Sequence, residues 1–163
     1  MDGGGSTRKA AWLIGLFGVA CSTSSTTSGP PPAQAFVGTW ARSGTVTTAC
    51  TGQAATQSVL TGTLDIAQGA DGNTIIGTDS VNHCATSYSV SANVATATPG
   101  QTCTFTNAKG GQSTSTQGTH TLTLSSDGKT MTTSNSGTVK VGPPDGGVAL
   151  DCTTQTDGTF TKQ

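Results

Sequence analysis

Histidine and aspartate are the side chains of this sequence best suited to acid–base chemistry. After residue 35 the chain holds His83, His120 and seven aspartates, most of them in turn sequences such as Asp127-Gly128. Catalysis of this kind needs an acid, a base and a nucleophile that converge on one reacting atom, and no spacing here indicates such a set. Serine and threonine are so frequent that a Ser-His-Asp combination arises by chance. We therefore expect no enzyme activity and no cofactor.

A metal site is not expected either. No two cysteines have CxxC spacing, and the sequence contains only two histidines. Asp71 and Asn73 are spaced like the start of a calcium loop, but the chain has no glutamate for the bidentate closing position. These turn residues are interpreted as structural.

Cysteine has a different use in this chain. Five cysteines are an awkward number for an exported protein unless one of them has a separate role. Setting Cys21 aside leaves an even set, Cys50, Cys84, Cys103 and Cys152, which allows three pairings. Because exported proteins fold in an oxidising compartment, we expect these four to form two structural disulfides.

The amino-terminal residues have the pattern of an export signal. Two basic residues precede an uncharged apolar run, residues 10–20, that is too short for a permanent membrane span. The run ends in Gly-Val-Ala-Cys, residues 18–21, which resembles the lipobox of bacterial lipoproteins. That resemblance implies a lipid on the thiol of Cys21 and cleavage before it. The alternative is an ordinary secretory signal, because Gly18 and Ala20 also suit signal peptidase.

Three parts of the chain follow from these features. Residues 1–20 are predicted to be the lipoprotein signal peptide, residues 21–35 the lipidated cysteine and a disordered Ser/Thr/Pro tether, and residues 36–163 the folded domain. The expected location is the bacterial cell envelope, as an outer-membrane lipoprotein bound to the membrane through its lipid. Only 9% of residues are charged and the basic ones are scattered, so we expect no binding to nucleic acid. The protein is expected to be a monomer.

The folded domain is predicted to be all-β. Apolar and polar residues alternate in short runs separated by Gly, Asn and Asp-Gly turns, which indicates eight or nine strands. The clearest run, residues 84–94, is interpreted as one strand, and Pro99-Gly100 as the turn that follows it. His120 shares the parity of Leu122, which predicts that its side chain points inward as a polar core or rim residue.

The parity of the four remaining cysteines indicates how the domain closes. All four fall at the apolar positions of their strands, where side chains on one face can meet. A hairpin places Cys84 beside Cys103, which leaves Cys50 to pair with Cys152. The second bond joins the first strand to the last, and in a meander these are neighbours only in a closed, antiparallel up-and-down β-barrel. An open β-sandwich is the alternative.

A family resemblance supports the barrel. Gly38-Thr39-Trp40, preceded by Phe36, is similar to the Gly-x-Trp signature that opens the lipocalin-like (calycin) barrels. The resemblance implies that Trp40 plugs one end of the barrel and that a basic residue of the last strand, here Lys162, packs across it. It also implies a cavity for a small apolar ligand.

The sequence thus predicts a lipid-anchored envelope protein that acts as a non-catalytic binding or surface module. One alternative is a lipocalin-like carrier of a small apolar ligand. Another is a structural or adhesive protein that presents repeated Thr-x-Thr units, for example in residues 119–123. A carrier should contain an open apolar cavity, whereas a structural protein should have a filled interior.

Overall fold

The computed structural model describes Met1 and residues 32–163. The described chain forms ten strands and one short 3₁₀-helix, and none of its helices is long and apolar enough to cross a membrane. In chain order the elements are η1 (Pro32–Phe36), β1 (Gly38–Cys50), β2 (Thr56–Leu60), β3 (Thr63–Gln68), β4 (Thr74–Asp79), β5 (Ala85–Ser91), β6 (Val94–Ala97), β7 (Thr102–Thr106), β8 (Gln112–Leu124), β9 (Thr130–Val141) and β10 (Leu150–Lys162).

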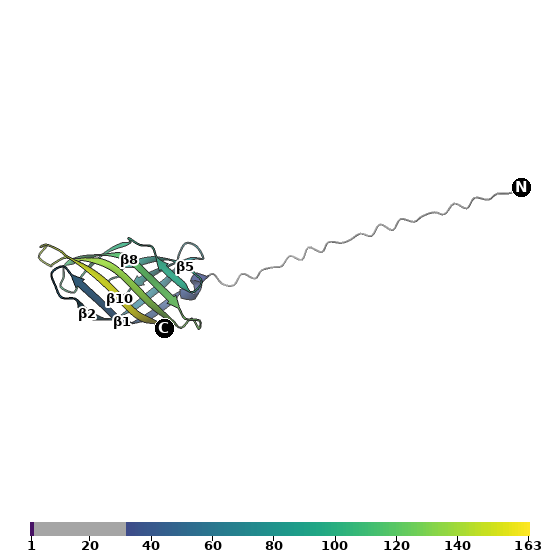
Figure 1. The fold of residues 1–163 in the computed structure, drawn as a ribbon, viewed down its shortest axis with the longest axis horizontal. Coiled ribbons are helices and arrows are strands. Elements are labelled where there is room, and N and C mark those ends of the chain that lie inside the picture. Colours follow the sequence, from purple (N-terminus) through teal and green to yellow (C-terminus); the bar gives the residue numbers. More distant parts are fainter. Residues whose placement is uncertain (2–31) are drawn as a thin grey trace.

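The strands form a closed antiparallel barrel, which confirms the predicted fold class and excludes the open sandwich (Figure 1). Around the barrel the order is β1-β3-β4-β5-β6-β8-β9-β10, so each strand pairs with its neighbours in an up-and-down meander. The first and last strands close the ring, in a register that runs from Trp40 opposite Lys162 to Cys50 opposite Cys152. Closure leaves no free edge along the eight strands of this ring.

The two remaining strands extend this ring. β2 and β3 pair with β1 in one continuous register, from Thr48 opposite Thr56 to Gly38 opposite Ile66, with an interruption at residues 61–62. β6 and β7 also follow one another along β8, interrupted at residues 98–101, with a register shift of one residue where β8 is irregular between Gln117 and His120. Each pair therefore acts as one long wall strand with a break in the middle.

Two strands are too short to reach the far end of the barrel. β4 and β5 end in the turn at residues 80–83, whereas β1, β8 and β10 each run for 13 residues. Beyond that turn the wall is a trough in the order β2-β1-β10-β9-β8-β7, with β2 paired only to β1 and β7 paired only to β8. The barrel consequently has a closed half and a half that is open on one side.

The closed half holds the hydrophobic core. η1 covers this end, where Ala33 and Phe36 are fully buried and Phe36 O accepts a 2.8 Å hydrogen bond from Trp40 Nε1. Figure 1 shows this short helix at the opposite end of the barrel from β2. The core cluster consists of Ala33, Phe36, Trp40, Leu64, Ile66, Ile75, Tyr88, Val90, Ala95, Ala97, Leu122, Leu124, Met131 and Phe160.

Two sequence predictions about strand breaks were wrong. Residues 84–94 are not one strand, because the chain reverses at Ala92 and Asn93 between β5 and β6, with Ser91 opposite Val94. Ala92 has a φ of 52°, a left-handed conformation that its residue type does not predict. Pro99-Gly100 is not a hairpin turn either; it lies at the break between β6 and β7, which both follow β8.

Both predicted disulfides are confirmed. Cys50 bonds to Cys152 across the β1–β10 pair, and Cys84 bonds to Cys103 with 5.7 Å between their Cα atoms. The second bond attaches the β4–β5 turn to β7 at the side of the trough. Two disulfides in a domain of this size indicate an oxidising, exported location.

The predicted signal peptide and the lipidation site Cys21 lie among residues 2–31, outside the described residues. Residues 32–35, assigned to the end of the tether from the sequence, form most of η1 and pack on the barrel. The described fold therefore starts slightly before Phe36.

Candidate functional site

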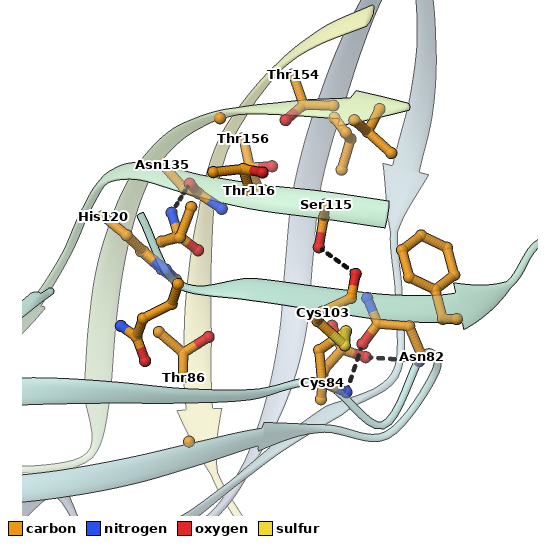
Figure 2. Close-up of a pocket in the computed structure, with 18 of the residues that line it drawn as sticks. Asn82, Cys84, Thr86, Cys103, Ser115, Thr116, His120, Asn135, Thr154 and Thr156 are labelled. Atoms are coloured by element: carbon orange, nitrogen blue, oxygen red, sulfur yellow. Dashed lines mark hydrogen bonds between the residues drawn. A yellow bond between two sulfur atoms is a disulfide. The ribbon is translucent and has the colours of Figure 1, made fainter. Parts of the chain in front are cut away.

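A cavity of about 420 Å³ occupies the open half of the barrel, above the apolar core. Its volume lies in the range of small-molecule sites, about 300–1,000 Å³. Inward-facing side chains of β1, β10, β9, β8 and β7 form most of its wall, and the β4–β5 turn lies at its side (Figure 2). About half of the lining residues carry hydroxyl or amide groups, among them Thr48, Thr86, Thr154, Thr156, Ser113, Ser115, Asn82, Asn135, Gln101 and Gln117.

The strand register arranges the polar groups in two neighbouring rows at middle depth. Taken across β1, β10, β9 and β8, the deeper row is Val46, Thr156, Asn135 and His120, and the next is Thr48, Thr154, Gly137 and Gln117. Gln117 Nε2 donates a 2.6 Å hydrogen bond to Asn135 Oδ1, which orients both amides. Figure 2 shows Thr154, Thr156, Asn135 and His120 gathered along this wall. We call these two rows the polar band.

Two further rows lie toward the mouth of the trough and are more apolar. Across the same strands and β7, the first is Cys50, Cys152, Val139, Ser115 and Cys103, and the outermost is Leu150, Val141, Ser113 and Phe105. Both disulfides therefore belong to one row, and Val139, Val141 and Phe105 line the cavity beside them. We call these rows the mouth band.

His120 lies at the boundary between the core and the polar band. Its side chain is buried, with Nδ1 3.1 Å from Tyr88 Oη and Nε2 3.1 Å from Thr133 Oγ1. Desolvation by burial lowers the pKa of His120 to about 4, and it raises the pKa of Tyr88 above its usual range. Both groups are consequently uncharged near pH 7.

An ion pair lies at the side of the cavity floor. The Arg42 guanidinium donates to both carboxylate oxygens of Asp79, with 3.1 Å between Nη2 and Oδ1, and its Nη2 also donates to Thr61 O at 2.8 Å. The Arg42 side chain is only 8% exposed. Asp79 Oδ1 in turn accepts a 2.7 Å hydrogen bond from Val81 N, so the pair ties β1 to the β4–β5 turn. The two charges of the cavity lining cancel locally.

The tryptophan singled out from the sequence lies at the other end of the barrel. Trp40 is fully buried, and Lys162 Nζ lies 5.2 Å from the centroid of its ring. Lys162 is the cross-strand partner of Trp40, which explains why a residue 122 positions later in the chain reaches it. This contact belongs to the closed end, away from the cavity.

Sequence reasoning identified His120 as an inward polar residue but missed Arg42 and the threonine and amide side chains of the polar band. Arg42 shares the parity of Trp40 and Val46 on β1, so alternation alone places it inside the barrel. The threonines of β10 have the parity of Cys152 and Phe160 and were detectable in the same way. They were overlooked because inward positions were identified by their apolar side chains.

The arrangement is suited to directed hydrogen bonding. Its hydroxyl and amide groups both donate and accept, and His120 and Tyr88 are held neutral by burial. Among the described residues, no three His, Cys, Asp or Glu side chains gather as a metal site would require. The cavity can therefore bind an uncharged molecule through directed hydrogen bonds and apolar contact.

Comparison with known proteins adds no assignment, because neither a protein-family model nor a curated protein matches this chain.

Proposed function

We propose that this protein is an exported, lipid-anchored envelope protein whose barrel is a non-catalytic binding module for a small uncharged molecule. The observation that carries the proposal is the cavity of about 420 Å³, whose wall is built from rows of hydroxyl and amide side chains. A barrel that served only as a spacer would gain more stability by filling this space with apolar side chains.

The anchoring part of the proposal rests on the sequence. The apolar run, the lipobox-like residues 18–21 and the polar segment that follows them support a lipid on Cys21 and an outer-membrane location. The two disulfides support export as such.

The lipocalin-like part of the proposal concerns architecture more than ligand. The up-and-down barrel and the contact between Trp40 and Lys162 are what that resemblance implies. The cavity wall, however, is richer in threonine, asparagine and glutamine than a site for a purely apolar ligand needs. We therefore propose a carrier or receptor for an uncharged ligand that has hydrogen-bonding groups.

An adhesive surface is the second candidate, and the outer face of the barrel favours it. Thr159, Thr132 and Thr123 are adjacent across β10, β9 and β8, and all three are exposed. Similar exposed hydroxyl rows continue along these strands, for example Thr153 beside Thr138. Such a surface presents regularly spaced hydroxyl and methyl groups to a partner.

Ligand retention tests the first candidate. The mature protein is purified from membranes under mild conditions and analysed by native mass spectrometry for a bound small molecule. Thr154→Phe fills the polar band and should abolish the bound mass, whereas Thr153→Phe, its outward neighbour on β10, should retain it. Retention of the bound mass by both variants, or no bound molecule in the unmodified protein, contradicts the binding module.

A further inference from the structure

The cavity changes in polarity with depth in an unusual order. Its floor is the apolar core with the Arg42–Asp79 ion pair at one side, and the polar band lies above it. The mouth band above that carries Val139, Val141, Phe105 and the disulfides, together with Ser113 and Ser115. A carrier of purely apolar molecules needs a continuous apolar interior, and a site for a fully polar molecule has no use for an apolar entrance. The order here matches a molecule with a polar end and an apolar end.

The charges limit the polar end to an uncharged group. Arg42 and Asp79, the charged residues of the lining, neutralise one another's charge through both Nη atoms, although the buried Nε of Arg42 has no hydrogen-bond partner. A charged head in the polar band would lose its hydration without gaining a free counter-charge. Hydroxyl and amide groups, in contrast, can exchange hydrogen bonds with Thr156, Thr154 and Asn135.

The apolar side chains at the mouth of the cavity indicate how the ligand is oriented. Val139, Val141 and Phe105 line the outer part of the cavity, and Leu150, which pairs with Val141, is 38% exposed. An apolar tail in this position covers these side chains. The reverse orientation would bury an apolar tail against Thr156 and Asn135 and leave the Thr156 hydroxyl and the Asn135 amide nitrogen without partners.

We infer that the ligand is a neutral amphiphile that binds with its polar head at the inner end of the cavity, an inference that rests on the proposed binding function. Its uncharged hydroxyl- or amide-bearing head lies in the polar band next to Thr156 and Asn135, and its short apolar tail lies on Val141 and Phe105 in the mouth band.

Three amphiphiles with matched tails test this inference on the full mature protein. The probes are 1-monooctanoylglycerol, octanoate and octyltrimethylammonium, each used below its micelle concentration, and binding is followed by NMR chemical shifts. Monooctanoylglycerol should shift signals in both bands, and both charged probes should bind at least about tenfold more weakly, because their heads lose hydration in a neutral site. Equal affinity for either charged probe, or no binding of monooctanoylglycerol, overturns the inference.

Two threonines on the same strand provide the matched variants. Thr156→Val removes one hydroxyl from the polar band and should weaken monooctanoylglycerol about three- to tenfold, the effect of one hydrogen bond. Thr153→Val removes a hydroxyl from the outer face of β10 and should leave its Kd unchanged. Thermal unfolding of both variants checks that they fold alike.

The outcomes separate this inference from the binding function itself. An unchanged Kd in Thr156→Val overturns the head-first orientation, even when shifts in Val141 and Phe105 show that the cavity is occupied. The binding module is contradicted independently, by the absence of any retained molecule in the native mass spectra.

Discussion

His120 shows how a single polar residue marks the border between the core and the cavity. It is buried beside Leu122, yet both of its ring nitrogens have hydroxyl partners, on Tyr88 and Thr133. Burial without a neighbouring carboxylate disfavours the imidazolium form, so protonation of His120 destabilises the fold.

This residue makes the stability of the barrel depend on pH. The pKa of His120 is about 4 in the folded protein, below its ordinary value of 6.5, so between these values the unfolded chain binds more protons. The free energy of unfolding should therefore fall as the pH is lowered from about 6.5 to 4, by up to about 3 kcal/mol. Denaturant unfolding at several pH values measures this. In His120→Gln the free energy of unfolding should lose most of this dependence on pH, whereas His83→Gln, at an exposed turn, should retain it.

The Arg42–Asp79 pair is a second test at the residue scale. Asp79→Asn leaves the 8%-exposed guanidinium without its counter-charge and should lower the free energy of unfolding by about 3 kcal/mol. Asp151→Asn breaks the ion pair with Lys140, in which the Lys140 and Asp151 side chains are 70% and 69% exposed. It should lower the free energy of unfolding by less than about 1 kcal/mol. If denaturant unfolding shows the same loss of free energy in Asp79→Asn and Asp151→Asn, then the Arg42 guanidinium binds another partner or water in the Asp79 variant.

At the scale of elements, the cavity exists because the strands differ in length. β4 and β5 have 6 and 7 residues and stop at the turn fixed by Asp79 and Cys84, whereas β1, β8, β9 and β10 continue. The continuing strands carry threonine and asparagine at inward positions instead of leucine or isoleucine, so the space above the core stays open.

The two disulfides hold different elements and should contribute unequally. Cys50–Cys152 closes a separation of 102 residues and Cys84–Cys103 one of 19. The chain-entropy model assigns these loops about 4 to 5 and about 3 kcal/mol. Replacing Cys50 and Cys152 by Ser should therefore destabilise the barrel more than replacing Cys84 and Cys103, as measured by denaturant unfolding without reductant. Replacing Cys50 and Cys152 should also speed hydrogen exchange in β1 and β10. A larger destabilisation on replacing Cys84 and Cys103 would contradict the loop-length argument.

At the scale of the whole molecule, the barrel has two unlike ends. η1 leads into the closed, apolar end, where Trp40 is buried, and the cavity lies in the opposite half. The proposed anchor on Cys21 precedes η1 in the chain, so it would attach to the barrel at the closed end and not at the mouth of the cavity.

The anchor itself is tested by Cys21→Ser. Without the thiol no lipid can be attached, and the variant should move from the membrane fraction to the soluble fraction. The unmodified protein is the control, and a high-salt wash removes proteins held only by charge. Persistence of the variant in washed membranes would show that another part of the chain or a partner holds it there.

Much of this architecture was predictable from local sequence. The two-residue alternation of strands is a local property, so it identified the inward His120 and the cysteines that meet across the barrel. With first and last strands linked by Cys50 and Cys152, a meander has to close into a barrel, because an up-and-down order leaves those strands apart in any open sheet.

Tertiary structure alone decided where strands end and what lies between them. The reversal at Ala92 follows from the pairing of β5 with β6, since alanine has no intrinsic preference for a left-handed conformation. The ion pair between Arg42 and Asp79 joins residues 37 positions apart, and its partners are defined only by the register of three strands. The cavity depends on the same registers, because parity shows which residues face inward but not how far each strand extends around the space they share.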